Sequence, residues 1–303
     1  MIRMILQNVT PDECYISFSG GKDSTVLHYL IDEAIPHNEY RRVYCDTGIE
    51  YQKIREFVYG LQQEDDRFEI IRPNKNIREM LLEDGYPFKS KFHSQLVASY
   101  QKCEATGKPL TKTVTEYVAR TSTHSDRVCP KKLLYQFQPD FTMKVSDKCC
   151  KRLKKEPFRK YEKETGRKLR VTGLRAAEGG ARSFSFSAGG GCVFRDKEGD
   201  IYQFSPLAPV SNEFIDWYVK TRNIKLASLY YPPFNFERTG CVMCPYSVHV
   251  GKQLMAIKDV LPAQFKQAWS IWRPVYEEYA RLNYRRLQDV PNPYKEEDSE
   301  EET

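Results

Sequence analysis

The stretch Ser19-Gly20-Gly21-Lys22-Asp23-Ser24 decides how the first part of this chain is built. It follows the apolar run Cys14-Tyr15-Ile16-Ser17-Phe18 and precedes residues 25–31, where apolar side chains recur at helical spacing. A strand, a glycine turn and the start of a helix therefore follow one another. Glycines let the backbone approach an anion closely, and the free N–H groups at the helix start point toward it. The stretch is thus predicted to bind phosphate.

The spacing of this turn separates it from two common nucleotide-binding signatures. A Walker motif places four residues between its first glycine and its Gly-Lys pair, and dinucleotide folds use Gly-x-Gly-x-x-Gly. The stretch instead resembles the signature of the PP-loop ATP pyrophosphatases, the adenine nucleotide alpha-hydrolase superfamily. An ordinary glycine turn is the alternative, and six matching residues in this context disfavour it.

The resemblance implies binding of Mg²⁺-ATP, with cleavage between the α- and β-phosphates, or binding of an adenylylated sulfate. It implies catalytic roles for Lys22 and Asp23. The implied nucleotide contacts in the turn are Ser19, Gly20, Gly21, Lys22, Asp23 and Ser24.

Strand and helix patterns alternate along the chain. Strands are predicted at 14–18, 42–45, 68–71 and 169–172, with helices at 24–34 and 51–61 between the first three. This order predicts an α/β fold: a parallel twisted sheet flanked by helices, of the PP-loop kind, with a helical C-terminal extension. Ligands bind such sheets at the carboxyl ends of the strands, where Asp46-Thr47-Gly48 lies. A helix N-cap is the alternative role for Asp46.

We divide the chain into a PP-loop domain at 1–247, a helical extension at 248–290 and an acidic, disordered tail at 291–303. Helices are predicted at Phe214–Lys220 and Lys252–Tyr284, with Trp269, Trp272, Val275, Tyr276 and Tyr279 as core. The insert 85–147 is less regular and is a lid, a partner surface or a peripheral helical insertion.

Composition excludes several classes of protein. The 303 residues carry a net charge of +6, and no apolar run approaches the roughly 20 residues that a membrane span needs. The first residues lack the apolar core of a signal peptide, so we expect a cytoplasmic protein with no membrane partner. Nine cysteines, an odd number, argue against a disulfide scaffold and favour metal binding or thiol chemistry.

Four of the cysteines are grouped as metal ligands would be. Cys149 and Cys150 are adjacent, and Cys241 and Cys244 form a C-x-x-C pair followed by Pro245. Neighbouring cysteines rarely both reach one tetrahedral zinc ion, whereas a cuboidal cluster offers each sulfur its own iron. We therefore favour a 4Fe-4S cluster, with zinc and free thiols as the alternatives.

This cysteine order resembles the iron–sulfur site of assimilatory adenylylsulfate reductases, in the phosphoadenosine phosphosulfate (PAPS) reductase family. Other segments that resemble the family are Asp46–Glu50, Lys154 and Pro157, Gly173–Arg182, Ser205–Leu207 and Thr239–Cys241. The resemblance covers residues 12–247, least well in the insert. It implies further nucleotide contacts at Asp46, Gly48, Gly173, Arg175 and Arg182.

Two departures from the reductases bear on the reaction. Those enzymes carry a nucleophilic cysteine in a C-terminal Glu-Cys-Gly motif, and this sequence has no cysteine after Cys244. They also often degrade the loop signature, which is intact here, as in DNA phosphorothioation sulfurtransferases and, more distantly, tRNA thiolases. Cys129 and Cys103 remain as candidates for a nucleophile or persulfide carrier, with a structural role as the alternative.

We therefore expect an enzyme that couples ATP cleavage to AMP and diphosphate with sulfur transfer. One alternative is an adenylylsulfate or PAPS reductase using Cys129 or a partner's thiol; another is a non-catalytic nucleotide- or cluster-sensing module. Lys148–Arg170 holds eleven basic and three acidic residues, which form either a solvated helix face or a rim for a polyanion such as a nucleic-acid acceptor. Besides the nucleotide and the acceptor, we expect a sulfur donor or a thioredoxin-like protein as a partner.

Overall fold

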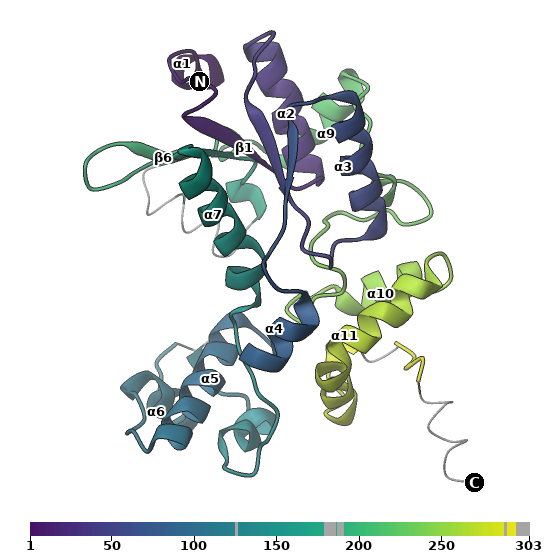
Figure 1. Ribbon diagram of the computed structural model, residues 1–303. Helices are drawn as coiled ribbons and strands as arrows, with labels where there is room; N and C mark the ends of the chain where they lie inside the picture. The colour runs from purple at the N-terminus through teal and green to yellow at the C-terminus, as the bar shows by residue number, and fades with distance from the viewer. Residues whose placement is uncertain (125–126, 179–185, 187–190, 288–289, 295–303) are drawn as a thin grey trace. The chain divides into compact units, whose positions relative to one another are not determined.

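The computed structural model describes residues 1–124, 127–178, 186, 191–287 and 290–294. The chain forms two compact units (Figure 1): the first joins Met1–Asn74 to Lys154–Thr239, and the second joins Lys75–Leu153 to the segment from Gly240 onward. These units do not follow the boundaries drawn from the sequence. The insert and the C-terminal helices share one unit because they bond to each other; Lys89 N, for example, donates to Tyr279 Oη at 2.8 Å.

The first unit is built around a six-stranded sheet in the order β3-β2-β1-β4-β6-β5. Its strands are β1 (Cys14–Phe18), β2 (Arg41–Cys45), β3 (Phe68–Ile71), β4 (Leu169–Thr172), β5 (Val193–Arg195) and β6 (Ile201–Phe204). Every neighbouring pair is parallel except the edge pair β5 and β6. The predicted α/β class and the four predicted strands are confirmed.

Helices cover both faces of this sheet, as Figure 1 shows for α2 and α7. The helices of this unit are α1 (Ile2–Leu6), α2 (Lys22–Ala34), α3 (Gln52–Glu64), α7 (Glu156–Thr165) and α9 (Asn212–Thr221). Alternate residues of β1 point to opposite faces: Cys14 and Ile16 pack in one core with residues of α2 and α9, whereas Tyr15 packs with Tyr161 of α7.

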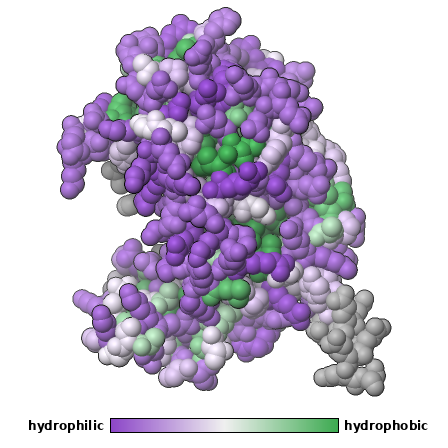
Figure 2. All heavy atoms as spheres, in the orientation of Figure 1, coloured by the Kyte–Doolittle hydropathy of each residue, from purple (hydrophilic) through white to green (hydrophobic). Residues whose placement is uncertain are grey.

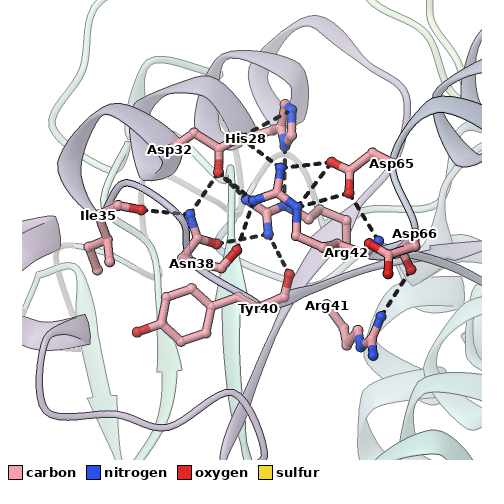
Figure 3. A network of polar contacts seen from close by, with 10 residues as sticks. His28, Asp32, Ile35, Asn38, Tyr40, Arg41, Arg42, Asp65 and Asp66 are labelled. Carbon is pink, nitrogen blue, oxygen red and sulfur yellow. Dashed lines mark hydrogen bonds and ion pairs between the residues drawn. The ribbon is translucent and has the colours of Figure 1, made fainter.

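A buried arginine ties β2 to the end of α2 (Figure 3). Arg42 is fully buried; it donates to Asn38 Oδ1 (2.9 Å) and to His28 Nδ1 (3.1 Å), and it pairs with Asp32. Arg67 pairs with the same carboxylate at 3.0 Å. Burial lowers the pKa of Arg42 to about 10, which still leaves the guanidinium charged at neutral pH. The network fixes the start of β2 beside the helix that carries the glycine turn.

The second unit is helical. It contains α4 (Ile77–Asp84), α5 (Lys91–Thr106), α6 (Lys112–Ala119), α10 (Val250–Lys258) and α11 (Pro262–Arg281). The supposedly less regular insert thus holds two regular helices, α5 and α6, whose Ser90 and Thr111 N-caps are ordinary helix-start signals. The helix predicted over 252–284 is wrong in extent: Pro262, which lacks an N–H donor, starts a new helix after a break at 259–261.

The five residues predicted as core in the C-terminal helix are buried in α11 as expected: Trp269, Trp272, Val275, Tyr276 and Tyr279. None of the described helices has the length and apolar character to cross a membrane, and the face of the chain drawn in Figure 2 is mostly hydrophilic.

Candidate functional site

The glycine turn between β1 and α2 has the conformation that an anion site needs. Gly20 has a φ of +70°, a region that favours glycine, and Gly21 is the N-cap of α2. The Ser19 and Ser24 hydroxyls lie 3.0 Å apart, and those of Ser24 and Thr25 donate to the Gly21 carbonyl at 2.9 and 3.0 Å. These bonds hold the turn in shape at the helix N-terminus, where N–H groups have no partner inside the helix.

Lys22 is held at both its backbone and its side chain by other parts of the first unit. Its N–H donates to the Tyr230 hydroxyl (2.9 Å), which also lies 3.1 Å from Thr239 Oγ1. Its Nζ pairs with Asp216 Oδ1 of α9 at 2.7 Å. A cavity of about 410 Å³ opens beside these groups, lined by Lys22, Asp216, Val219, Lys220, Asn223, Ile224, Leu226, Tyr230, Tyr231 and Phe236.

The end of β4 lies against the glycine turn through Gly173 and Arg175, two residues for which the family resemblance implies nucleotide contacts. A Cβ at Gly173 would lie 3.1 Å from the Asp23 carbonyl oxygen and 3.2 Å from Ser24 N, so this position needs a residue without a side chain. Arg175 is buried and pairs with Asp23 Oδ1 at 3.0 Å. The structure therefore places Arg175 at the turn through Asp23.

Asp46 lies at the carboxyl end of β2, next to β1 in the sheet. Its carboxylate accepts from Gly48 N (3.1 Å), Arg55 Nη2 (3.1 Å) and Tyr59 Oη (2.8 Å). The N-cap of α3 is Tyr51, so the helix-cap alternative for Asp46 is wrong. Gly48 has a φ of +79° and nothing lies within 4 Å of its Cβ position, which leaves open space at this strand end.

The four grouped cysteines all belong to the second unit and lie within electrostatic reach of one another. The buried Cys149 thiol has a pKa raised well above its usual range by a hydrogen bond with Cys150, by burial and by the charges of Cys244 and Cys241. Cys149 and Cys150 lead directly into a π-helical turn, Lys151–Lys155. Such turns occur often at functional sites.

Helix α11 holds the loop Cys241–Pro245, called the cysteine loop below. Trp272 Nε1 donates to the Val242 carbonyl at 3.0 Å, the Tyr276 hydroxyl donates to the Met243 carbonyl, and Tyr279 Oη donates to the Pro245 carbonyl at 3.1 Å. These three side chains lie on one face of the helix, at spacings of four and three residues. Arg286 also donates to the Pro245 carbonyl, at 2.6 Å.

The number and type of these donors are those of an iron–sulfur cluster. Four thiols from two segments match the ligand count of a 4Fe-4S cluster. Over the described residues, no three His, Cys, Asp or Glu side chains are arranged to hold one metal ion. A cluster, which presents a separate iron to each sulfur, does not require that the four sulfurs surround one point.

Cys129 lies in an environment that disfavours a nucleophile. It is fully buried, and burial raises the pKa of its thiol to about 11 against the opposing charges of Lys89 and Arg120. The thiolate is the reactive form, so this thiol is mostly unreactive near neutral pH. Cys103 is partly exposed, and its thiol lies 3.5 Å from the Pro109 carbonyl oxygen.

The basic run is partly neutralised. Lys148 and Arg152 both pair with Asp84, at 2.8 and 2.9 Å, and Arg170 pairs with Glu162. On α7, the side chains of Arg159, Lys160 and Lys163 are exposed. This exposure is compatible with both predicted roles of the basic run, a solvated helix face and a rim for an anionic partner.

Arg182, for which the family resemblance implies a nucleotide contact, lies outside the described residues.

Three residues near these sites were missed by reasoning from the sequence: Asp216, Tyr230 and Tyr246. The Tyr246 hydroxyl donates to the Ser146 carbonyl at 3.3 Å, and its pKa is raised by burial and by the nearby Cys149 and Cys244. No local motif marks Asp216 and Tyr230, because they reach Lys22 from distant parts of the sequence, whereas Tyr246 directly follows the Cys241–Pro245 segment.

A profile of the family described as "Phosphoadenosine phosphosulfate reductase domain" matches residues 13–123 and 110–247. Among curated proteins, an uncharacterized protein of Methanocaldococcus jannaschii is 23% identical over 258 residues. The match covers 83% of this chain and 45% of that protein, so the chain spans less than half of the relative's length.

Two solved structures are similar at low identity. A phosphoadenylyl-sulfate (PAPS) reductase from Candida auris, in complex with phosphate, has a TM-score of 0.42 and 14% identity, covering 79% of this chain and 92% of that one. A U34-tRNA thiolase from Methanococcus maripaludis, with its 4Fe-4S cluster, has a TM-score of 0.36 and 15% identity, covering 97% and 80%. At these TM-scores neither likeness bears on the reaction of this chain.

Proposed function

This chain belongs to the phosphoadenosine phosphosulfate reductase domain family, within the PP-loop superfamily, and from that premise we propose that it is an ATP-using sulfur-transfer enzyme. The family is a nucleotide-binding family of sulfur metabolism. The observation that carries the finer proposal is the intact turn Ser19–Ser24 at the N-terminus of α2, with Lys22 and Arg175 gathered at it. A turn with this many donors suits a polyphosphate.

In the proposed reaction, Mg²⁺-ATP is the substrate and the turn binds its phosphates. An oxygen of the acceptor attacks the α-phosphorus, and the bond between the α-phosphorus and the bridging oxygen breaks, so that diphosphate leaves. A sulfur nucleophile then displaces AMP, which carries away the original acceptor oxygen. Lys22 and the backbone N–H groups of the turn would offset the negative charge that develops on the phosphates.

We propose that Cys149, Cys150, Cys241 and Cys244 hold a 4Fe-4S cluster. When bound, such a cluster supplies an iron site that can carry sulfide or pass electrons. The chain's own contribution is to fix the ligand loop: α11 holds three of its carbonyls, and the π-helical turn follows the other two cysteines.

The acceptor would be an anionic molecule, a nucleic acid being one class. The exposed basic side chains of α7 support this part of the proposal. A sulfur donor or thioredoxin-like protein would complete the set of partners.

Reduction of adenylylsulfate or PAPS is the second candidate, favoured by the family description itself. This reaction needs a thiolate that reaches the sulfur. The burial and the raised pKa of Cys129 weigh against that residue, which leaves a partner's thiol as the nucleophile.

Binding by calorimetry tests the nucleotide proposal. Lys22→Ala should weaken ATP binding by at least tenfold, about 1.4 kcal/mol. The matched control is Lys53→Ala, which removes a lysine paired with Glu56 on α3. Equal ATP affinities in wild type and Lys22→Ala would defeat the proposed phosphate site.

An activity assay separates the two reactions. Anaerobically purified protein, given thioredoxin and either adenylylsulfate or its 3′-phosphate, should release little sulfite. Rapid thioredoxin-dependent release of sulfite would overturn the ATP-using proposal in favour of reduction.

A further inference from the structure

Two donors of the proposed phosphate-binding turn, the N–H and the Nζ of Lys22, are already engaged by residues outside the turn. We propose that Asp216 and Tyr230 are internal stand-ins for phosphate, which occupy the side chain and the N–H of Lys22 until the phosphates of a ligand displace them. This inference rests on the proposed phosphate site and deepens it, because it names the residues that set how much charge a ligand must carry.

Asp216 acts on the side chain of Lys22. The Nζ to Oδ1 distance is 2.7 Å, and 64% of the Asp216 side chain is exposed. A carboxylate at this distance offers the lysine the same kind of partner as a phosphate oxygen. An ion pair this exposed to water is weak, so a polyphosphate with several charges can replace it.

Tyr230 acts on the backbone. Its hydroxyl accepts from Lys22 N at 2.9 Å, and Lys22 is the first residue of α2. This N–H therefore belongs to the group of helix-start donors that bind anions. Burial raises the pKa of Tyr230, so its hydroxyl is neutral and competes less well for this donor than a charged oxygen does.

The space around Gly21 supports the same assignment. A Cβ built on Gly21 would lie 3.2 Å from Ser19 Oγ, 3.4 Å from Tyr230 Oη and 3.5 Å from Thr239 Oγ1. Three hydroxyls thus converge on a position that is free of side-chain atoms. The cavity beside them, about 410 Å³, is lined by Lys22, Asp216 and Tyr230 and gives displaced side chains room to move.

The consequence is a bias toward highly charged ligands. A ligand must compete with one carboxylate and one hydroxyl before it gains the two donors of Lys22. Without bound metal, ATP and diphosphate carry more negative charge than adenylylsulfate, so they overcome this competition more readily.

Calorimetry with inorganic diphosphate, in the absence of divalent metal, tests the inference. Asp216→Asn should tighten diphosphate binding by about two- to fivefold, the strength of an exposed ion pair. Tyr230→Phe should tighten it by about two- to tenfold, the net strength of a hydrogen bond. The matched control is Glu33→Gln, which removes an ion pair at 2.9 Å between α2 and Arg222, the residue that follows α9, and should leave binding unchanged.

Thermal melting of each variant checks that the fold is intact. Unchanged or weaker diphosphate binding in both Asp216→Asn and Tyr230→Phe, with Lys22→Ala still weaker than wild type, overturns this inference alone. Equal binding in wild type and Lys22→Ala would instead remove the phosphate site on which both proposals stand.

Discussion

Alanine at two adjacent glycines of the proposed phosphate-binding turn should act mainly on stability at Gly20 and mainly on nucleotide binding at Gly21. Gly20 has a φ of +70°, and a Cβ there would lie 2.7 Å from Val58 Cγ2 and 2.8 Å from Ile54 Cγ2, both buried in α3. A left-handed residue with a side chain costs about 1–2 kcal/mol, and overpacking costs about 1–3 kcal/mol. Gly20→Ala should therefore lower the free energy of unfolding by about 2–5 kcal/mol.

Gly21 is different because its backbone is ordinary. Its φ is −80°, and the closest atom to a new Cβ is the movable Ser19 hydroxyl at 3.2 Å. Gly21→Ala should cost about 1 kcal/mol of stability, the usual difference between glycine and alanine at an N-cap. The methyl group would nevertheless fill the hollow among three hydroxyls, so ATP binding should weaken by at least tenfold, about 1.4 kcal/mol.

Urea denaturation and calorimetry on the same samples distinguish the two effects. The control is Gly60→Ala in α3, where nothing lies within 4 Å of the new Cβ and alanine should stabilise the helix by about 0.5–1 kcal/mol. A Gly20→Ala protein within 1 kcal/mol of wild type, or a Gly21→Ala protein that binds ATP normally, would refute the account of the turn.

Three further predictions concern the second unit. After anaerobic purification, Cys241→Ser should have lost most of its iron and labile sulfide, whereas Cys129→Ser should keep both. Full iron content in Cys241→Ser would show that Cys241 is not a cluster ligand. Trp272→Phe leaves a buried carbonyl of the cysteine loop unpaired and should cost about 1–3 kcal/mol in urea denaturation, whereas Trp217→Phe, at a side chain 56% exposed, should change little. Burial lowers the pKa of His93 to about 4, against about 6.5 in the unfolded chain. The neutral imidazole therefore contributes about 3 kcal/mol to the free energy of unfolding above pH 6.5, and this contribution is lost as the pH falls toward 4. Urea midpoints at pH 7.5 and 5 should therefore differ more in wild type than in His93→Gln, and equal differences would contradict this assignment.

Much of the sheet could be predicted because its signals are local. The strands at 14–18, 68–71 and 169–172 are short apolar runs bounded by turns, and the structure gives them the same limits. The place of Asp46 at a strand end of the sheet followed from the rule that ligands bind parallel sheets at the carboxyl ends of the strands. The break before Pro262 was missed: apolar spacing predicted one helix over 252–284, although a proline is typical of a first helical turn.

The parts that could not be predicted depend on long-range contacts. Asp216 and Tyr230 reach Lys22 across 194 and 208 residues, and their local sequences are ordinary helix and loop. Trp272 was correctly predicted as core, but its indole N–H also holds the cysteine loop 30 residues earlier. Apolar spacing identifies which residues are buried and contains no information about which carbonyl a buried donor will meet.

The order in which the ribosome makes these segments has a consequence for maturation. Cys149 and Cys150 are synthesised first, the cysteine loop about ninety residues later, and the three side chains of α11 that hold the loop only after that. Until Tyr279 and Arg286 have left the ribosome, the Pro245 carbonyl lacks both of its donors. We therefore expect a released chain truncated before residue 262 to expose reactive thiols at Cys241 and Cys244, and any metal to be loaded after synthesis has passed α11.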